Sequence, residues 1–431
     1  MSKFYMTGYP IEKAVAIGLY FSKNLYKDLW PIEDAQAEFL ELIRSSGLHI
    51  LRDYSVRVDR PIPGTMIGKG KILELHDACH DLQPDVVIFG EELTASQQQN
   101  LEDLLGMKVI DRTQLILDIF AQRAHSTEGK VQVELAQLEY LVPRLGGKGV
   151  LKLSRLGGGI GTRGPGEQKL ETDRRRIRQR ISRLKQDLKQ VHARRQVARQ
   201  KREEEHIPMV ALIGYTNAGK STLLNVLTQA GTHTENRLFS TLDPLARRLV
   251  LPDHQPMLLS DTVGFIHHLP HHLVESFAAT LEEVTESQLL VHVLDASHSM
   301  MASQEEAVHE VLRMLKAEEK QMLLVLNKVD KLGAEDREAL RRKYPDAVLL
   351  SAATGEGIPH LLDRLSAILS SRMRAAEILV APAQGRWLKH IYTQGRVFSR
   401  EETAEGVLLK ARLPHQLYGQ LQKAGLIRVS S

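Results

Sequence analysis

The stretch Met209-Val210-Ala211-Leu212-Ile213-Gly214-Tyr215-Thr216-Asn217-Ala218-Gly219-Lys220-Ser221 predicts a buried strand that ends in a phosphate-binding loop. The first five residues are apolar, and the last eight match the pattern G-x-x-x-x-G-K-[ST]. A helical-looking stretch follows, so strand, loop and helix come in the order that phosphate binding requires. An ordinary turn containing glycine is the alternative, and this context argues against it.

In such a loop, glycines let the backbone N–H groups turn toward phosphate oxygens. Lys220 would reach the terminal phosphates, and the Ser221 hydroxyl would ligate Mg²⁺. We therefore expect residues 214–221 to hold the phosphates of a nucleoside triphosphate.

Two later segments are predicted to contact Mg²⁺ and the terminal phosphate. Asp261-Thr262-Val263-Gly264 follows an apolar run, so Asp261 can hold a water on Mg²⁺ while Gly264 approaches the terminal phosphate. Phe239-Ser240-Thr241-Leu242-Asp243 lies before it, and Thr241 is the hydroxyl best placed to close onto the metal. The sequence predicts Mg²⁺ held by Ser221, Thr241 and, through water, Asp261. We expect Lys220, Thr241 and Gly264 to act at the terminal phosphate during hydrolysis.

The base is predicted by Asn327-Lys328-Val329-Asp330, again at the end of an apolar run. Asp330 could accept hydrogen bonds from the ring N1–H and the exocyclic amine of guanine, whereas adenine would leave the carboxylate unpaired, at a cost of about 1–3 kcal/mol. Asn327 would contact the purine or hold the phosphate loop, and the Lys328 stem would cover the ring. Ser351-Ala352-Ala353 would offer a backbone N–H to the guanine oxygen.

These five segments occur in the order found in the translation-factor-related class of GTPases, which the sequence resembles. The fold that such a site implies is a doubly wound, mostly parallel α/β sheet. One position departs from many relatives, because Phe265 stands where a glutamine commonly orients the attacking water. We expect slow intrinsic hydrolysis, with the water positioned by the backbone, by another side chain or by a partner that orders the loop.

Length and composition predict several domains in a reducing compartment. The chain has 431 residues, 42% of them hydrophobic, and a single cysteine, Cys79, so no intrachain disulfide can form. No apolar run approaches the ~20 residues of a membrane helix, and the N-terminus lacks the basic-then-apolar layout of a signal peptide. We expect a cytoplasmic protein without a membrane span, monomeric in solution.

The charge is distributed unevenly. Between Lys169 and Arg202 there are 14 Lys or Arg residues against three acids, although the net charge of the whole chain is only +4. Such a concentration is typical of a contact with a polyanion, and nucleic acid is the expected one. A solvated face of a coiled coil is the alternative.

The same segment is predicted to form one arm of an antiparallel helical hairpin. Apolar residues recur there at alternating spacings of four and three, and a partner seam lies upstream; the two seams are Ile177, Ile181, Leu184, Leu188, Val191 and Val131, Leu135, Leu138, Val142. Residues 144–168 between the arms are rich in glycine and basic, which suits a tip that enters folded RNA rather than a merely flexible linker. The expected RNA contacts are Lys148, Lys152, Arg155, Arg163, Arg174, Arg175 and Arg176.

Around this hairpin we expect four units: an N-terminal α/β domain over 1–125, the hairpin over 126–206, the GTPase (G) domain over 207–373 and a small C-terminal domain over 374–431. In the first unit, strands are predicted at Ala14–Tyr20, Val86–Phe89 and Val109–Ile110, with a helix from Thr94 to Leu105 capped by Thr94 or Ser96. The stretch Gly68-Lys69-Gly70-Lys71 matches no complete nucleotide motif, and a loop leading into a helix is the favoured interpretation.

Together these residues resemble the GTPase HflX family across essentially the whole chain. The most specific matches lie outside the G domain, in Asp111-Arg112-Thr113, Leu115-Ile116-Leu117-Asp118-Ile119-Phe120-Ala121, Glu128-Gly129-Lys130-Val131-Gln132-Val133-Glu134-Leu135-Ala136-Gln137-Leu138 and Gly158-Gly159-Ile160-Gly161-Thr162-Arg163-Gly164-Pro165-Gly166-Glu167. An apolar residue at position 265 is itself a trait of that family.

The resemblance implies a bacterial GTPase that binds the large ribosomal subunit and its RNA, is activated by that subunit, and splits stalled ribosomes under stress such as heat. GTP would be the substrate and Mg²⁺ the cofactor. Two alternatives stay open. One is an ATP-dependent, helicase-like enzyme that remodels RNA through the N-terminal domain, and the other is a binding module in which GTP only switches the shape.

Overall fold

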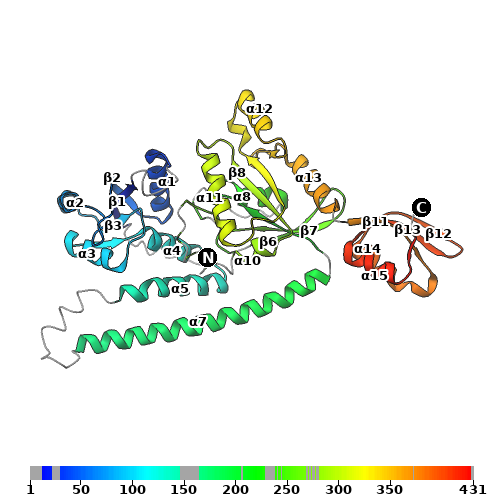
Figure 1. Ribbon diagram of the computed structural model, residues 1–431, viewed down its shortest axis with the longest axis horizontal. Coiled ribbons are helices and arrows are strands. Elements are labelled where there is room, and N and C mark those ends of the chain that lie inside the picture. Colours follow the sequence, from blue (N-terminus) through cyan, green and yellow to red (C-terminus); the bar gives the residue numbers. More distant parts are fainter. Residues whose placement is uncertain are drawn as a thin grey trace, which may run out of the picture.

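The computed structural model describes residues 12–21, 30–145, 165–204, 207–228, 238–239, 241–243, 245–267, 270, 273, 277, 281–371 and 373–428. Figure 1 shows an N-terminal domain and a G domain side by side, a long helix running along both, and a C-terminal domain at the far end. The prediction of a multidomain α/β protein with a phosphate-loop domain is confirmed. No helix among these described residues is long and apolar enough to span a membrane.

The N-terminal domain has a four-stranded parallel sheet in the order β2-β1-β3-β4. Alternate residues of β1 face opposite sides, so that Val15 and Ile17 pack with α2 and α3 while Ala14 and Ala16 pack with α1 and α4. The elements are β1 (Lys13–Phe21), α1 (Ile32–Ser45), β2 (His49–Val58), α2 (Lys69–Leu82), β3 (Val86–Phe89), α3 (Ala95–Leu105), β4 (Lys108–Ile110) and α4 (Arg112–Arg123).

The expected strands and helix of this domain are present. Thr94 caps α3 through a capping box with Gln97, as the Thr-x-x-Gln spacing predicts. Gly68-Lys69-Gly70-Lys71 opens α2, and the Lys71 ammonium pairs with Glu74 at 2.7 Å. The edge strand β2 was not predicted, because its polar residues interrupt the apolar pattern.

The G domain has a six-stranded sheet in the order β10-β9-β8-β5-β7-β6, in which only β6 runs antiparallel to its neighbour among the described strands. Val210 and Leu212 of β5 pack toward α8 and α13, whereas Ala211 and Ile213 pack toward α10 and α11, so the sheet is wound on both faces. The elements are β5 (Met209–Ile213), α8 (Lys220–Thr228), β6 (Leu245–Val250), β7 (Pro256–Asp261), α10 (Glu282–Glu286), β8 (Leu289–Asp295), α11 (Met301–Met314), β9 (Met322–Asn327), η2 (Val329–Lys331), α12 (Ala334–Lys343), β10 (Val348–Leu349) and α13 (Ile358–Ser371).

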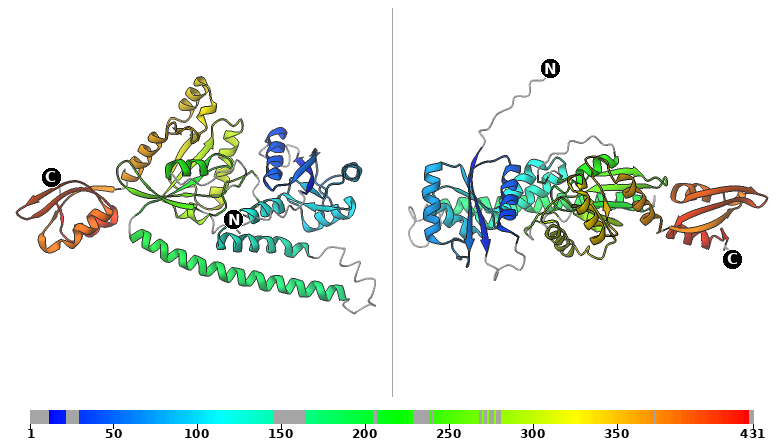
Figure 2. Two further views of the ribbon diagram at one scale, coloured as in Figure 1. Left: turned by 180° about the vertical axis from the view of Figure 1, so that it is seen from behind. Right: turned by 90° about the horizontal axis from the view of Figure 1, so that it is seen from above.

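Two helices, α5 (Thr127–Leu141) and α7 (Pro165–Glu204), lie side by side and run in opposite directions (Figures 1 and 2). We call this pair the basic hairpin. Leu184 is buried in the seam, and ion pairs join Arg180 to Glu134 and Lys185 to Glu139. Helix α5 also contributes Val133 and Tyr140 to the core of the N-terminal domain, so one arm belongs to that domain as well. The arm ends in η1 (Val142–Arg144).

The C-terminal domain follows α13 directly and has its own core. It comprises β11 (Met373–Val380), η3 (Pro382–Gln384), α14 (Arg386–Gln394), β12 (Arg396–Thr403), β13 (Gly406–Pro414), α15 (His415–Lys423) and β14 (Ile427–Arg428). The predicted strand over Gly406–Lys410 is the first half of β13.

Candidate functional site

The predicted nucleotide segments gather at the carboxyl edge of the G-domain sheet. The phosphate loop (residues 214–221) follows β5, loop II (residues 262–267) follows β7, and the base segment (residues 327–330) follows β9. Loop I (residues 238–243) precedes β6, and Ser240 lies outside its described residues. Ligands of open α/β sheets bind at this edge, where neighbouring connections leave on opposite faces.

Two glycines of the phosphate loop are required by close packing. Gly214 has a φ of +150°, and a Cβ there would lie 2.2 Å from the carbonyl oxygen of Val293. Gly219 has a φ of +95°, and a Cβ there would lie 2.2 Å from the side-chain nitrogen of Asn327. A side chain at either position would therefore displace the loop from β8 or from the base segment.

The Lys220 ammonium is buried within the loop and donates to the carbonyl oxygens of Gly214 at 3.0 Å and Tyr215 at 2.9 Å. Burial lowers its pKa to about 8, and the nearby Asp261 carboxylate opposes that shift. An ammonium held by two neutral carbonyl oxygens lacks a full counter-charge, so a phosphate would compensate for its burial.

Three oxygen-bearing side chains meet beside Lys220. The Ser221 hydroxyl donates to Asp261 Oδ2 at 2.6 Å, the Thr241 hydroxyl donates to the same atom at 2.9 Å, and the two hydroxyls are 2.8 Å apart. Burial raises the pKa of Asp261, opposed chiefly by Lys220, and its Oδ1 is buried without a hydrogen-bond partner. Hard oxygen ligands with one unused carboxylate oxygen fit a Mg²⁺ ion and its waters.

The base segment supports the phosphate loop from the side. Asn327 donates to the carbonyl oxygen of Ala218 at 2.8 Å and accepts from the Ala352 N–H at 2.9 Å, so it links three predicted segments. The Lys328 ammonium contacts the carbonyl oxygen of Asn217 at 2.7 Å and pairs with Asp295 at 2.7 Å. The Asp330 side chain is exposed at the edge, where it can accept hydrogen bonds from a base.

Other predicted residues have structural contacts. Thr262 donates to the carbonyl oxygen of Leu212 at 2.7 Å, and Val329 is buried with its N–H directed to Leu350 at 3.3 Å. Ser351 is buried and its hydroxyl accepts from the Thr354 N–H at 3.2 Å, while Ala353 is exposed.

Phe265 is 1% exposed and packs in the core beneath α10 and α11, with Ile213 and Leu290. Its backbone bridges to the phosphate loop, since its carbonyl accepts from the Thr216 N–H at 2.7 Å and its N–H donates to Gly214 at 3.2 Å. The phenyl ring therefore faces the core, and its backbone holds loop II against the phosphate loop.

Contacts between the N-terminal domain and the phosphate loop were not predicted by any pattern in the sequence. The Tyr215 hydroxyl donates to Glu38 on α1 and accepts from the His267 N–H at 2.7 Å. Arg112 on α4 donates to Glu38 at 2.8 Å and to the carbonyl oxygen of His267 at 2.8 Å. The Trp30 ring stacks on that of His267, with centroids 4.7 Å apart. The phosphate loop and loop II are thus joined to the N-terminal domain by buried polar contacts.

Loop I contacts the start of the basic hairpin. The Asp243 carboxylate accepts from the His125 N–H at 2.8 Å, from the Ser126 N–H at 2.7 Å and from the Ser126 hydroxyl. Ser126 is the N-cap of α5, and its Oγ accepts from the Gly129 N–H at 2.9 Å. A Cβ at Gly129 would lie 2.2 Å from Asp243 Oδ1, so glycine lets the first turn of α5 approach this carboxylate.

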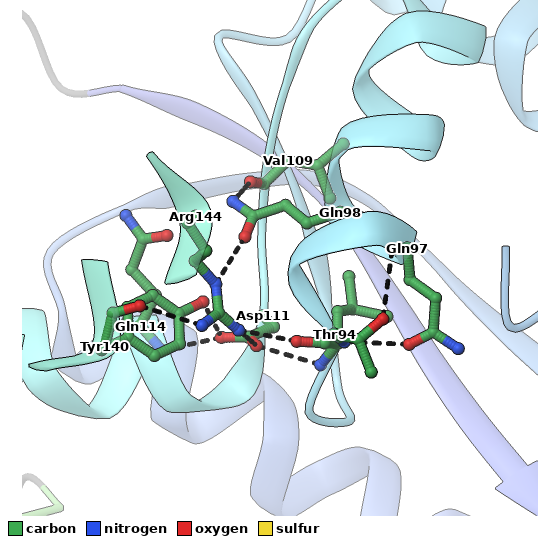
Figure 3. A network of polar contacts seen from close by, with 9 residues as sticks. Thr94, Gln97, Gln98, Val109, Asp111, Gln114, Tyr140 and Arg144 are labelled. Atoms are coloured by element: carbon green, nitrogen blue, oxygen red, sulfur yellow. Dashed lines mark hydrogen bonds and ion pairs between the residues drawn. The ribbon is translucent and has the colours of Figure 1, made fainter. Parts of the chain in front are cut away.

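The far end of α5 is fixed by a buried network around Asp111 (Figure 3). This carboxylate accepts from the Leu93 N–H at 3.0 Å, from the Tyr140 hydroxyl at 2.8 Å and from the Arg144 guanidinium at 3.3 Å. The Arg144 guanidinium also covers the Tyr140 ring, with its Cζ 3.4 Å from the ring centroid. Because Arg144 is the first residue of the Gly-rich segment, the base of that segment is anchored to the N-terminal domain.

Only some of the residues predicted to contact RNA lie in the part of the chain that the structure describes. Lys148, Lys152, Arg155 and Arg163 lie outside the described residues, and Arg174, at the start of α7, is half-buried. Arg175 and Arg176 are exposed, the latter with Asp173 at 3.7 Å.

A phosphate loop, two loops that carry candidate metal ligands and a base segment on a doubly wound sheet define the class of phosphate-loop GTPases. Four family models match this chain: GTP-binding GTPase N-terminal over residues 33–121, GTP-binding GTPase Middle Region over 123–202, 50S ribosome-binding GTPase over 209–328 and HflX C-terminal domain over 338–425.

The chain is 45% identical over 393 residues to the GTPase HflX of Lacrimispora saccharolytica, covering 90% of this chain and 92% of that relative. It is 44% identical over 409 residues to the GTPase HflX of Escherichia coli (strain K12), covering 94% of each. The chain therefore belongs to the GTPase HflX family and is a GTPase. A GTP-binding protein from the archaeon Sulfolobus solfataricus, solved with GDP, overlaps with a TM-score of 0.43 and 23% identity, covering 83% of this chain and 99% of that one.

Proposed function

We propose that this GTPase acts on the large ribosomal subunit, hydrolyses GTP slowly by itself and faster when bound there, and separates stalled ribosomes under stress such as heat. The observation that carries the proposal is that Thr241, a candidate metal ligand, lies two residues before Asp243, which holds the first turn of the basic hairpin. The nucleotide site therefore contacts α5, the arm that pairs with the basic helix α7 in the hairpin expected to meet RNA.

At the nucleotide, we propose that the N–H groups of residues 214–221 and the Lys220 ammonium bind the phosphates. Asp330 would select guanine, and Asn327 would keep the base segment against the phosphate loop. Ser221, Thr241 and Asp261 would hold Mg²⁺, which would neutralise charge on the phosphates as the bond to the leaving oxygen breaks. Gly264 would offer its N–H to the terminal phosphate.

The attacking water needs a different partner from the usual glutamine. The Phe265 ring is buried in the core and cannot orient a water molecule. The backbone of loop II is already bonded to the phosphate loop and, through His267, to the N-terminal domain. We infer that contact with the large subunit rearranges these bonds and thereby positions the water, which gives slow turnover without the subunit.

Loop I would carry the nucleotide state to the hairpin. Thr241 would serve as a ligand of Mg²⁺ when GTP is bound, and Asp243 would then keep the bonds to Ser126 that it makes in this structure. After hydrolysis, a loop I that loses the metal would release these bonds and free the first turn of α5. Arg144 anchors the other end of α5. This change would therefore alter the orientation of α5 without detaching the helix from the N-terminal domain.

The hairpin would bind ribosomal RNA by charge. Arg175 and Arg176 are exposed on α7, and the glycine-rich segment of residues 144–168 contains five Lys or Arg residues, of which Arg144 is bound to Asp111. Guanidinium groups neutralise phosphates and release counterions, so this contact should weaken steeply as salt is raised.

The test is steady-state hydrolysis of GTP and of ATP by the purified chain, with and without isolated large subunits, at about 50 and about 200 mM salt. We expect a large rise in GTP turnover only with subunits and only at the lower salt. Equal stimulation by short RNA oligonucleotides, or none at all, would overturn the proposal.

Three further measurements separate the alternatives. Asp330→Ala should reduce the preference for GTP over ATP, since the base then loses its carboxylate partner. ATP turnover that survives Lys220→Ala would favour the RNA-remodelling enzyme. Ribosome separation that continues over many rounds with a non-hydrolysable GTP analogue would favour a pure binding switch.

A further inference from the structure

The C-terminal domain has one covered and one open sheet face. Its elements run β-α-β-β-α-β, and the antiparallel sheet has the order β12-β13-β11-β14. Both helices lie on the same side, where Ile391 of α14 and Leu417 and Leu421 of α15 pack on the strands (Figure 1). No element among the described residues covers the other side of this sheet.

The alternation of β13 shows what the open face carries. Leu409, Ala411 and Leu413 are buried against the helices, so the intervening Lys410 and Arg412 point to the open face, where both are exposed. Pairing places Arg412 between Ala375 of β11 and Arg396 of β12.

An aromatic ring lies among these cations. Phe398 of β12 stands at an irregularity in the pairing with β13, and 54% of it is exposed. The guanidinium carbons of Arg396 and Arg412 lie 5.0 Å and 5.9 Å from its ring centroid. Arg396 is also paired with Asp253 of the G domain at 2.9 Å, whereas Arg412 faces no carboxylate among the described residues.

The charge of the domain matches a polyanion. Residues 374–431 contain nine Lys or Arg against four Glu, which makes this domain the second basic region of the chain after the hairpin. Not every cation is available, since Lys410 lies 3.1 Å from Glu377 and Arg400 lies 2.9 Å from Glu402, all at the surface. Arg412, beside the exposed ring, forms no ion pair with a carboxylate among the described residues, so its guanidinium is available to a ligand.

We propose that the open face of the C-terminal sheet binds unpaired bases of RNA, with a base stacked on Phe398 and an adjoining phosphate held by Arg412. An exposed ring flanked by guanidinium groups suits this ligand better than a protein, because every base offers a π-face and every nucleotide brings a phosphate. This contact is separate from the hairpin. The large subunit as its natural source rests on the function proposed above, whereas the binding of unpaired bases does not.

The experiment uses the full-length protein and a fluorescent single-stranded RNA of about 12 nucleotides at low salt, within the range of site sizes for such surfaces. Binding is followed by anisotropy for Phe398→Ala and Arg412→Glu. Matched controls are Tyr392→Ala, an exposed aromatic on α14 at 49%, and Lys423→Glu, an exposed cation on α15. We expect Phe398→Ala to weaken binding by about tenfold, Phe398→Trp to preserve it, and both controls to bind as the unchanged protein does.

Because the hairpin also binds RNA in our proposal, the site is located by photo-crosslinking with 4-thiouridine in the same RNA. Crosslinks within residues 396–412 that disappear in Phe398→Ala are the expected result. Crosslinks confined to the hairpin, together with unchanged affinity of Phe398→Ala, would overturn the proposal. Thermal unfolding of each variant checks that the domain remains folded, which we expect since the ring is exposed.

Large subunits supply the second readout. If Phe398→Ala binds subunits more weakly but binds the RNA oligonucleotide normally, the face contacts a protein and the proposal is wrong. If the oligonucleotide does not bind but subunits still stimulate GTP hydrolysis, this inference fails and the proposed function stands. If the oligonucleotide binds through Phe398 while subunits give no stimulation, the proposed function fails and this site stands.

Discussion

The two domains that flank the G domain are attached to it in different ways. On the N-terminal side, Phe120 of α4 packs edge-on against Phe239 of loop I and Phe277, with ring centroids 4.9 Å and 4.7 Å apart, in a core to which both domains contribute. On the C-terminal side, the domain has a core of its own, and the Arg396 guanidinium pairs with Asp253 of the G domain at 2.9 Å across the boundary.

This difference shows where a nucleotide signal can travel. The N-terminal contacts involve Tyr215 of the phosphate loop, Asp243 of loop I and His267 of loop II, so they depend on the conformation of the nucleotide site. Asp253 lies in the turn between β6 and β7, at the opposite end of these two strands from loop I and loop II. We infer that the N-terminal domain and hairpin respond to GTP, while the C-terminal domain serves as a constant binding surface.

Lys220→Ala should largely abolish the GTP hydrolysis to which the N-terminal domain, but not the C-terminal domain, is expected to respond. We expect GTP turnover to fall by about 10²–10³-fold, because a buried ammonium that stabilises charge at the phosphates is lost. Turnover with saturating subunits is the measurement, and Lys316→Ala, a lysine exposed after α11, is the control. Turnover within about tenfold of the unchanged protein would place the chemistry elsewhere.

Phe120→Ala tests the shared core directly. Phe120 is 2% exposed, so we expect the free energy of unfolding to fall by about 3–5 kcal/mol. Phe398→Ala, the same change at the open C-terminal face, should cost no more than about 0.5 kcal/mol. Denaturant unfolding of both variants checks the contrast, and similar losses would contradict it.

Ser126→Ala tests the contact between loop I and the hairpin without altering a nucleotide ligand. It removes a hydroxyl that donates to Asp243 and caps α5, at a cost of about 0.5–2 kcal/mol. We expect basal turnover to stay the same and stimulation by large subunits to fall several-fold. Thr94→Ala removes a similar cap from α3, far along the chain from the nucleotide site, and should leave stimulation intact. Equal losses in both variants would mean that only stability matters.

The pH dependence of GTP binding tests the protonation state of the Lys220 side chain. Burial lowers its pKa to about 8 in the nucleotide-free protein, and a bound phosphate should raise it again. Above pH 8, GTP binding must therefore take up a proton, so the affinity should fall by up to about tenfold per pH unit as the pH rises, with no such slope below pH 8. Titrations between about pH 7 and 9 measure this, and Lys220→Arg, which stays charged, should show no slope.

Arg396→Ala should have the smallest effect. The pair with Asp253 is partly exposed, so we expect a loss of at most about 1 kcal/mol in stability and no change in basal GTP turnover. A large fall in turnover would show that the C-terminal domain is also coupled to the nucleotide site. The proposed difference between the N-terminal and C-terminal domains would then be wrong.

The sequence predicted the elements of the site better than their surroundings. The phosphate loop, the Asp261 segment and the base segment each follow an apolar strand, so short patterns place them at one sheet edge. The hairpin seam could also be predicted, since its spacing is local. The bonds of Tyr215 to Glu38 and of Asp243 to Ser126 could not, because each joins residues more than 100 positions apart and neither residue type is unusual in a loop.

Phe265 illustrates a different limit. Its residue type predicts that the ring does not orient water, but it does not predict where the ring lies. The direction of the side chain depends on the bridge between loop II and the phosphate loop, which is a tertiary contact. Likewise, the open face of the C-terminal sheet follows from the order of its strands, and the residues of those strands carry no signal of that order.

The length of α7 has a mechanical consequence. At about 1.5 Å per residue, a helix of 40 residues is about 60 Å long, and its last residue stands five positions before the strand that leads into the phosphate loop. Such a helix works as a lever. A tilt of only about 5° at the G domain would move its opposite end by about 5 Å, comparable to one helical turn. In the function proposed above, a small change at the nucleotide would thus become, at the far end of α7, a displacement of about 5 Å against the RNA that the hairpin is proposed to bind.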